Sequence, residues 1–155
     1  MLYLKFLGLF VVAHTVSYLI AGAISLRFSK DIYESKQRLC TFLMDMSNEQ
    51  ERKHVEKYFL PAQILRGILM AIVLLPILSS LGELSFLLKF FFFASLMFVY
   101  SHLAAVSPFL DNIEGQVYFR RKYIQKKSFY KFQLEMLMYC MLFGLLMTVF
   151  IGFIL

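Results

Sequence analysis

Hydrophobic residues along the chain are concentrated in four long blocks, separated by two polar stretches and one short turn. The blocks cover residues 2–26, about 60–79, about 86–107 and 134–155. A helix rises 1.5 Å per residue, so a block of about 20 residues can cross the ~30 Å hydrocarbon core of a bilayer. The pattern predicts an all-α integral membrane protein with four transmembrane helices in a single domain.

Composition agrees with this fold class. Of the 155 residues, 60% are hydrophobic and 17% are charged, whereas soluble domains are about half apolar and about a quarter charged. The first block contains Ala21-Gly22-Ala23, which resembles a signal-peptidase site. Its apolar run is too long for a signal peptide and its N-terminal region carries few basic residues. We therefore expect it to be retained as a span.

The Lys and Arg residues indicate the orientation. They are concentrated in the loops 27–59 and 108–133, whereas the turn at 80–85 has none. The positive-inside rule then predicts that both loops are cytoplasmic and that both termini are outside. The net charge of +6 is explained by this topology together with the anionic inner leaflet of a plasma or inner membrane.

The first loop contains apolar residues at helical spacing, which predicts an amphipathic helix; they are Ile32, Leu39, Phe42, Leu43 and Met46. Ser47 and Gln50 match a capping box, which predicts that a second helix begins there and runs toward Tyr58. Pro61 suits the opening turn of the second span, and Pro76 predicts a kink near its outer end. The loop either lies on the bundle and headgroups or docks a partner subunit.

The second loop interleaves aromatic rings with a basic patch made of Arg120, Arg121, Lys122, Lys126 and Lys127. Such a sequence can bind nucleic acid through stacking and phosphate contacts. Beside a transmembrane helix it more often anchors the chain at the membrane surface. We expect a membrane anchor and no nucleic-acid partner.

Ionisable residues within spans are costly and are therefore candidate functional residues. Several lie in the cytoplasmic third of the predicted bundle or just below it: Arg66, His102, Glu135, Asp111 and Glu114. They predict a polar pocket at the cytoplasmic mouth, with Arg66 facing the acids. Alternatively, Arg66 and Glu135 reach the headgroups directly, and His102 forms a hydrogen bond between helices.

His14 lies near the middle of the first span, beside Thr15, Ser17 and Tyr18, which could satisfy it locally. Haem bound between His14 and His102 would need both rings at one depth, yet His102 lies about 6–9 Å nearer the inner surface. The sequence also lacks HExxH, CxxC clusters, GxSxG and nucleotide-binding loops. We therefore expect no metal and no cofactor, and the sequence gives no positive support for an enzyme.

Small residues recur every four positions in three spans, a pattern typical of close helix packing in membranes. They are Ser17, Ala21 and Ser25; Gly67 and Ala71; and Gly144, Thr148 and Gly152. We expect these residues to pack within the chain.

Three functional hypotheses fit the sequence. The favoured one is a noncatalytic subunit or accessory protein of a larger membrane assembly, bound to a partner membrane protein. A second is a small transporter or channel acting as a homo-oligomer through the polar pocket. A third is an enzyme acting on a lipid or quinone at the inner leaflet.

Overall fold

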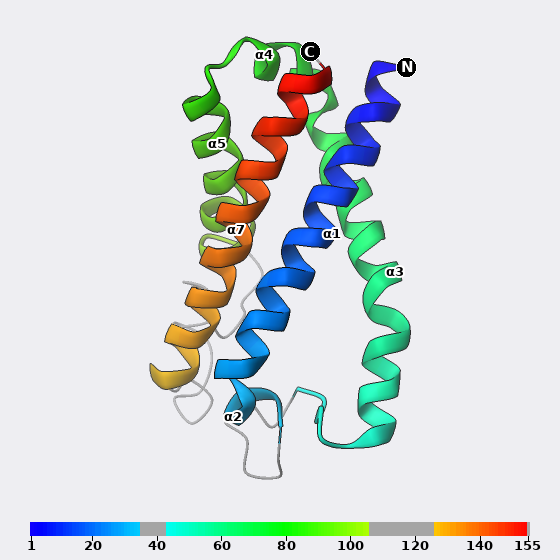
Figure 1. Ribbon diagram of the computed structural model, residues 1–155, viewed down its shortest axis with the longest axis vertical. Coiled ribbons are helices and arrows are strands. Elements are labelled where there is room, and N and C mark those ends of the chain that lie inside the picture. The colour runs from blue at the N-terminus through cyan, green and yellow to red at the C-terminus, as the bar shows by residue number, and fades with distance from the viewer. Residues whose placement is uncertain (35–42, 106–125, 155) are drawn as a thin grey trace.

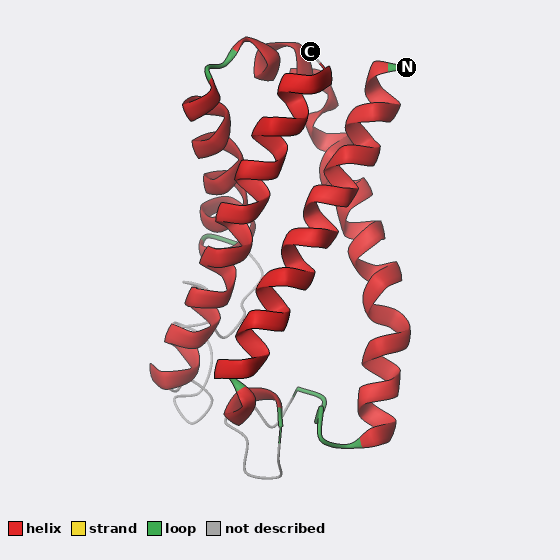
Figure 2. Cartoon of the chain, viewed as in Figure 1, coloured by secondary structure: helices red, strands yellow, loops and turns green. Residues whose placement is uncertain are grey.

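The computed structural model describes residues 1–34, 43–105 and 126–154, and in the last segment it describes side chains from Phe129 onward. Every regular element in these three segments is a helix (Figure 2). The elements are α1 (Leu2–Phe28), α2 (Lys30–Tyr33), α3 (Glu49–Leu74), the 3₁₀ helix η1 (Leu75–Ile77), α4 (Leu78–Glu83), α5 (Phe86–Ser95), the π-helix η2 (Leu96–Leu103) and α7 (Lys126–Ile154).

Four helical stretches are long and apolar enough to cross a membrane, which confirms the prediction of an all-helical protein with four membrane spans. They are Leu2–Phe28, Glu49–Glu83, Phe86–Leu103 and Phe129–Ile154. The start of α1 and the end of α7 lie at the same end of the molecule (Figure 1). We call this the termini end. The opposite end, where α1 ends and α3 begins, is the loop end.

The spans pack in the order α3, α1, α7, α5, because the extensive interfaces join α1 to α7, α5 to α7, and α1 to α3. Helix α1 therefore lies between α3 and α7 (Figure 1). The core between these helices is rich in aromatic and long apolar side chains that are fully buried, namely Phe6, Phe10, Phe93, Phe143, Met147 and Ile151.

Small residues line these interfaces, as predicted. Ser17, Ala21 and Ser25 of α1 are all buried. At Gly144 of α7, an added Cβ would lie 2.9 Å from the carbonyl oxygen of Phe90, so glycine lets α5 approach closely. Gly152 differs from the prediction, because an added Cβ there would meet no atom within 4 Å.

In the first loop, α2 is the helical part among the described residues, and the predicted amphipathic helix is not continuous beyond it. Helix α2 ends at Tyr33, and Glu34 has an extended backbone with φ −123° and ψ 145°. Residues 43–48 form bends and turns, and the Met46 amide donates to the Tyr33 carbonyl oxygen at 2.9 Å. The Ile32 side chain packs with Phe132 of α7 and is therefore buried within the protein. Leu39 and Phe42 lie outside the described residues.

The second helix begins one residue later than predicted. Asn48 is the N-cap, and its side chain accepts from the amides of Gln50 at 2.9 Å and Glu51 at 3.2 Å. Ser47 instead donates its hydroxyl to Asp45 at 2.6 Å. The Asn48 side chain, one position nearer the helix, therefore takes the capping role.

Both prolines of the second span lie within its helical stretch. Pro61 is inside α3, not at its opening turn, because the helix from Glu49 continues into the apolar segment without a break. Pro76 lies in η1, where the backbone tightens into a 3₁₀ turn between α3 and α4. A kink was predicted here, and the observed change is this 3₁₀ turn.

The loop-side boundaries of spans three and four also shift. The third span ends at Leu103, short of residue 107, because the chain turns at Ala104. Helix α7 begins at Lys126, eight residues before the predicted start at 134. Its first two turns extend the last span beyond its most apolar part.

Candidate functional site

The most completely buried polar site is centred on His14, in the middle of α1. Its Nδ1 lies 2.6 Å from the hydroxyl oxygen of Tyr139 on α7, and its Nε2 lies 3.0 Å from Oε1 of Gln63 on α3. An amide oxygen only accepts, so Nε2 carries the proton and donates to Gln63. In the neutral ring, Nδ1 then accepts from the Tyr139 hydroxyl. One histidine thus joins three transmembrane helices.

The surroundings of His14 explain how α3 and α7 come within reach. A Cβ added to Gly67 would lie 3.2 Å from the Val11 Cα and 3.5 Å from His14 Cδ2, so glycine allows α3 to approach α1 closely. On the other side, the ring of Phe143 packs edge-on against His14, with centroids 6.4 Å apart. Packing on both sides fixes the imidazole plane.

These partners differ from the local ones that the sequence suggested. Gln63 and Tyr139 lie 49 and 125 residues away along the chain. Within the described segments, the hydroxyls of Thr15 and Ser17 are buried and have no hydrogen-bond partner. The available signal for the true partners was weak: both are uncharged polar residues within apolar spans.

The unpaired Ser17 hydroxyl leads to a matched pair of variants. Ser17→Ala is expected to leave the free energy of unfolding unchanged or to raise it by about 1 kcal/mol, since it removes a buried polar group without a partner. Ser25→Ala is expected to lower it by about 1 kcal/mol, because the Ser25 hydroxyl donates to Glu135 at 2.8 Å. Chemical unfolding in mild detergent measures both. Equal losses of unfolding free energy in the two variants would contradict the conclusion that Ser25, unlike Ser17, has a hydrogen-bond partner.

A second polar cluster joins α1 and α2 to α7 at the loop end. One carboxylate oxygen of Glu135 accepts from Ser25 at 2.8 Å and from the Tyr33 hydroxyl at 3.0 Å. Lys131 donates to the Phe28 carbonyl oxygen at 2.6 Å and pairs with Asp31. Glu135 is therefore held by hydroxyl groups of this chain.

His102 reaches its position through the π-helix η2. Met97 and His102 are five residues apart and are both buried, a spacing that matches the wider π turn. Tyr100, which an α-helix would place nearer the Met97 side, is 77% exposed. His102 Nε2 lies 3.4 Å from Oε1 of Gln133 on α7. Local π-helices are frequent at functional sites.

Arg66 projects from an exposed side of α3. Its guanidinium carbon lies 5.9 Å from the centre of the Tyr18 ring on α1, a distance at which a cation interacts with an aromatic face. Arg66, His102 and Glu135 thus have contacts with different neighbours.

The proposed acidic side of the pocket and most of the basic patch lie outside the described residues, namely Asp111, Glu114, Arg120, Arg121 and Lys122. Lys126 and Lys127 begin α7, and their side chains also lie outside the described part. The polar pocket and the membrane-surface patch therefore stay predictions.

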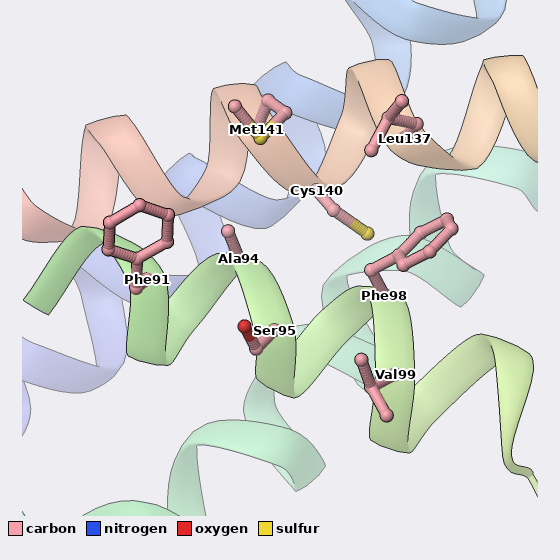
Figure 3. Close-up of a pocket in the computed structure, with 8 residues that line it drawn as sticks. All are labelled: Phe91, Ala94, Ser95, Phe98, Val99, Leu137, Cys140 and Met141. Atoms are coloured by element: carbon pink, nitrogen blue, oxygen red, sulfur yellow. The ribbon is translucent and has the colours of Figure 1, made fainter. Parts of the chain in front are cut away.

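A hollow of about 130 Å³ lies between α7 and the stretch formed by α5 and η2 (Figure 3). Its lining is almost entirely apolar and consists of Phe91, Ala94, Ser95, Phe98, Val99, Leu137, Cys140 and Met141. Cys140 is a free, buried thiol. Across the three described segments, no group of three or more His, Cys, Asp or Glu residues could hold a metal ion.

No protein-family model matches the chain, and no curated protein or solved structure shows significant similarity to it. Composition and fold define the class: this is a small membrane protein with four transmembrane helices.

Proposed function

We propose that this protein is a noncatalytic subunit or accessory protein of a larger membrane assembly. The observation that supports this most is the bonding of His14. Its ring is fully buried, and both ring nitrogens are bonded to residues of the same chain. Both ring nitrogens join α3 and α7 to α1, so the residue serves to hold helices together.

A surface of α3 supports the presence of a partner. This helix packs against α1 through a narrow stripe, Gln63, Gly67, Ala71 and Leu74. Elsewhere it exposes a row of apolar side chains at four-residue spacing, Leu65, Leu69 and Val73. Rows of this spacing form the ridges that fit the grooves of a second helix. We call this row the α3 ridge, and we propose that a transmembrane helix of the partner packs on it.

The proposed orientation places the loops 27–59 and 108–133 in the cytoplasm and both termini outside, in a plasma or inner membrane. The distribution of Lys and Arg supports this orientation. The joining of α1, α2 and α7 at the loop end by Lys131 and Asp31 agrees with a polar aqueous boundary there.

Native mass spectrometry after gentle extraction from the source membrane tests the proposal. We expect the chain to coelute with a larger membrane protein at fixed stoichiometry. Leu69→Trp on the α3 ridge should reduce coelution at least about fivefold, because misfit at a packed interface costs about 1–3 kcal/mol. Val12→Trp, on an exposed position of α1, is the matched control and should leave coelution intact. A chain that elutes only as a homo-oligomer would contradict the proposal.

A small oligomeric transporter or channel is the second candidate function. It is supported by η2, which turns His102 from the lipid-facing side toward Gln133. In that case His102→Ala would abolish flux of a proton or anion in liposomes while the fold is kept. The subunit proposal expects His102→Ala to be tolerated.

A further inference from the structure

Arg66 is a cation in an apolar part of α3, and none of the ion pairs among the described residues includes it. It lies six residues beyond Leu60, where the apolar segment begins, which corresponds to about 9 Å along a helix. Among the described residues, the guanidinium lies over the Tyr18 ring. A charge at this depth is costly unless it meets an opposite charge or reaches the interface.

The side chain of Arg66 points toward the loop end. Gly67, its neighbour in sequence, lies opposite Val11 and His14. The guanidinium lies instead over Tyr18, which is one turn nearer the loop end of α1 than His14. This direction follows from helix geometry, because side chains lean toward the N-terminus of their helix. The guanidinium group of Arg66 therefore lies nearer the boundary of the hydrocarbon region than its Cα does.

Small residues flank the Arg66–Tyr18 contact toward the loop end. Gly22 follows Tyr18 by one turn of α1, and an added Cβ there would meet no atom within 4 Å. On α3, Ala62 precedes Arg66 by one turn and is small and exposed. None of residues 49–62 is buried, and α3 diverges from α1 toward the loop end (Figure 1).

The acidic residues at the start of α3 have other partners. Glu49 pairs with Lys53 at 2.7 Å, and Glu56 pairs with Arg52 at 3.7 Å. Glu51 accepts from the Asp45 amide at 2.5 Å. These carboxylates are engaged within the polar first turns of the helix, so they do not neutralise Arg66.

We propose that Arg66 binds the phosphate of a phospholipid headgroup from the leaflet at the loop end. The guanidinium fork can donate two parallel hydrogen bonds to phosphate oxygens, and the Tyr18 ring supports its other face. The acyl chains lie along the exposed apolar sides of α1 and α3, among which are Ile20 and Ile64. The site joins one lipid to the interface between these two helices, and basic sites between spans on the cytoplasmic side are known to bind anionic headgroups.

Native mass spectrometry of the purified chain, titrated with phosphatidylglycerol in mild detergent, tests this site. We expect Arg66→Gln to weaken binding of the first lipid about tenfold, the effect of losing charge-assisted hydrogen bonds. Arg66→Lys should be intermediate, because it keeps the charge and loses the fork. Arg52→Gln is the matched control: it removes an exposed arginine of the same helix and should leave lipid affinity unchanged.

Three results would overturn the proposal. The first is equal lipid affinity in the wild type, Arg66→Gln and Arg66→Lys. The second is displacement of the lipid by an equal concentration of inorganic phosphate, which would assign the site to free phosphate. The third is release of a copurifying protein by Arg66→Gln with lipid affinity unchanged, which would assign Arg66 to a partner's carboxylate. Because Arg66→Lys retains the charge, it keeps the test decisive if Arg66→Gln fails to fold.

Discussion

Replacing His14 with leucine is expected to lower the free energy of unfolding in mild detergent by about 2–4 kcal/mol. The substitution would leave the Tyr139 hydroxyl and the Gln63 amide oxygen without partners in an apolar interior. Each buried polar group left without a partner costs about 1–3 kcal/mol. We expect values near the lower end of that range, because hydrogen bonds between transmembrane helices contribute modestly to stability. Denaturant titration followed by circular dichroism measures the loss.

Single variants of the two partners separate the contributions. Tyr139→Phe and Gln63→Leu should each cost less than His14→Leu, and double-mutant cycles with His14→Leu should show coupling for both pairs. Val16→Leu, at an exposed position of α1, is the control and should be nearly neutral. A His14→Leu chain as stable as the wild type would show that the triad contributes no stability.

Substituting Gly144 with alanine is expected to separate α5 from α7. The new methyl group would lie 2.9 Å from the Phe90 carbonyl oxygen and 3.0 Å from the backbone nitrogen and Cβ of Ala94. Because backbone atoms cannot move aside cheaply, we expect a loss of about 1–3 kcal/mol in the free energy of unfolding. Thermal unfolding in detergent measures it.

Gly152→Ala provides the matched control for Gly144→Ala. The two glycines lie two turns apart on α7, and an added Cβ at Gly152 would meet no atom within 4 Å. Its substitution should cause no loss, and the better helix propensity of alanine can add up to about 1 kcal/mol. If both variants lost stability equally, the close approach of α5 would not be the cause.

The spans could be predicted because length and hydropathy are local properties of the chain. The small-residue stripes were predictable for the same reason, since four-residue spacing places Ser17, Ala21 and Ser25 on one side of a helix. The failure at Gly152 shows that four-residue spacing alone does not reveal which small residues face a neighbouring helix.

The site was harder to predict, since its contacts join distant segments. Arg66, His102 and Glu135 were predicted as site residues because ionisable side chains are rare within spans. Gln63 and Tyr139 are uncharged, so the sequence did not distinguish them from other span residues. The position of His102 depends on a π-helix, whose wider turn changes which residues share a side. The spacing of Ile32 and Leu43 suggested a loop helix, whereas tertiary contacts with Phe132 account for those residues.

The central position of α7 between α1 and α5 has a consequence for the order of assembly during synthesis. The fourth span is inserted after the other three, yet α1 and α5 both depend on it for their largest interfaces. Until it arrives, His14 lacks its Tyr139 partner and Gly144 has not yet met Phe90. Before the fourth span inserts, the first span therefore lacks its largest interface, and His14 has only its Gln63 partner on α3.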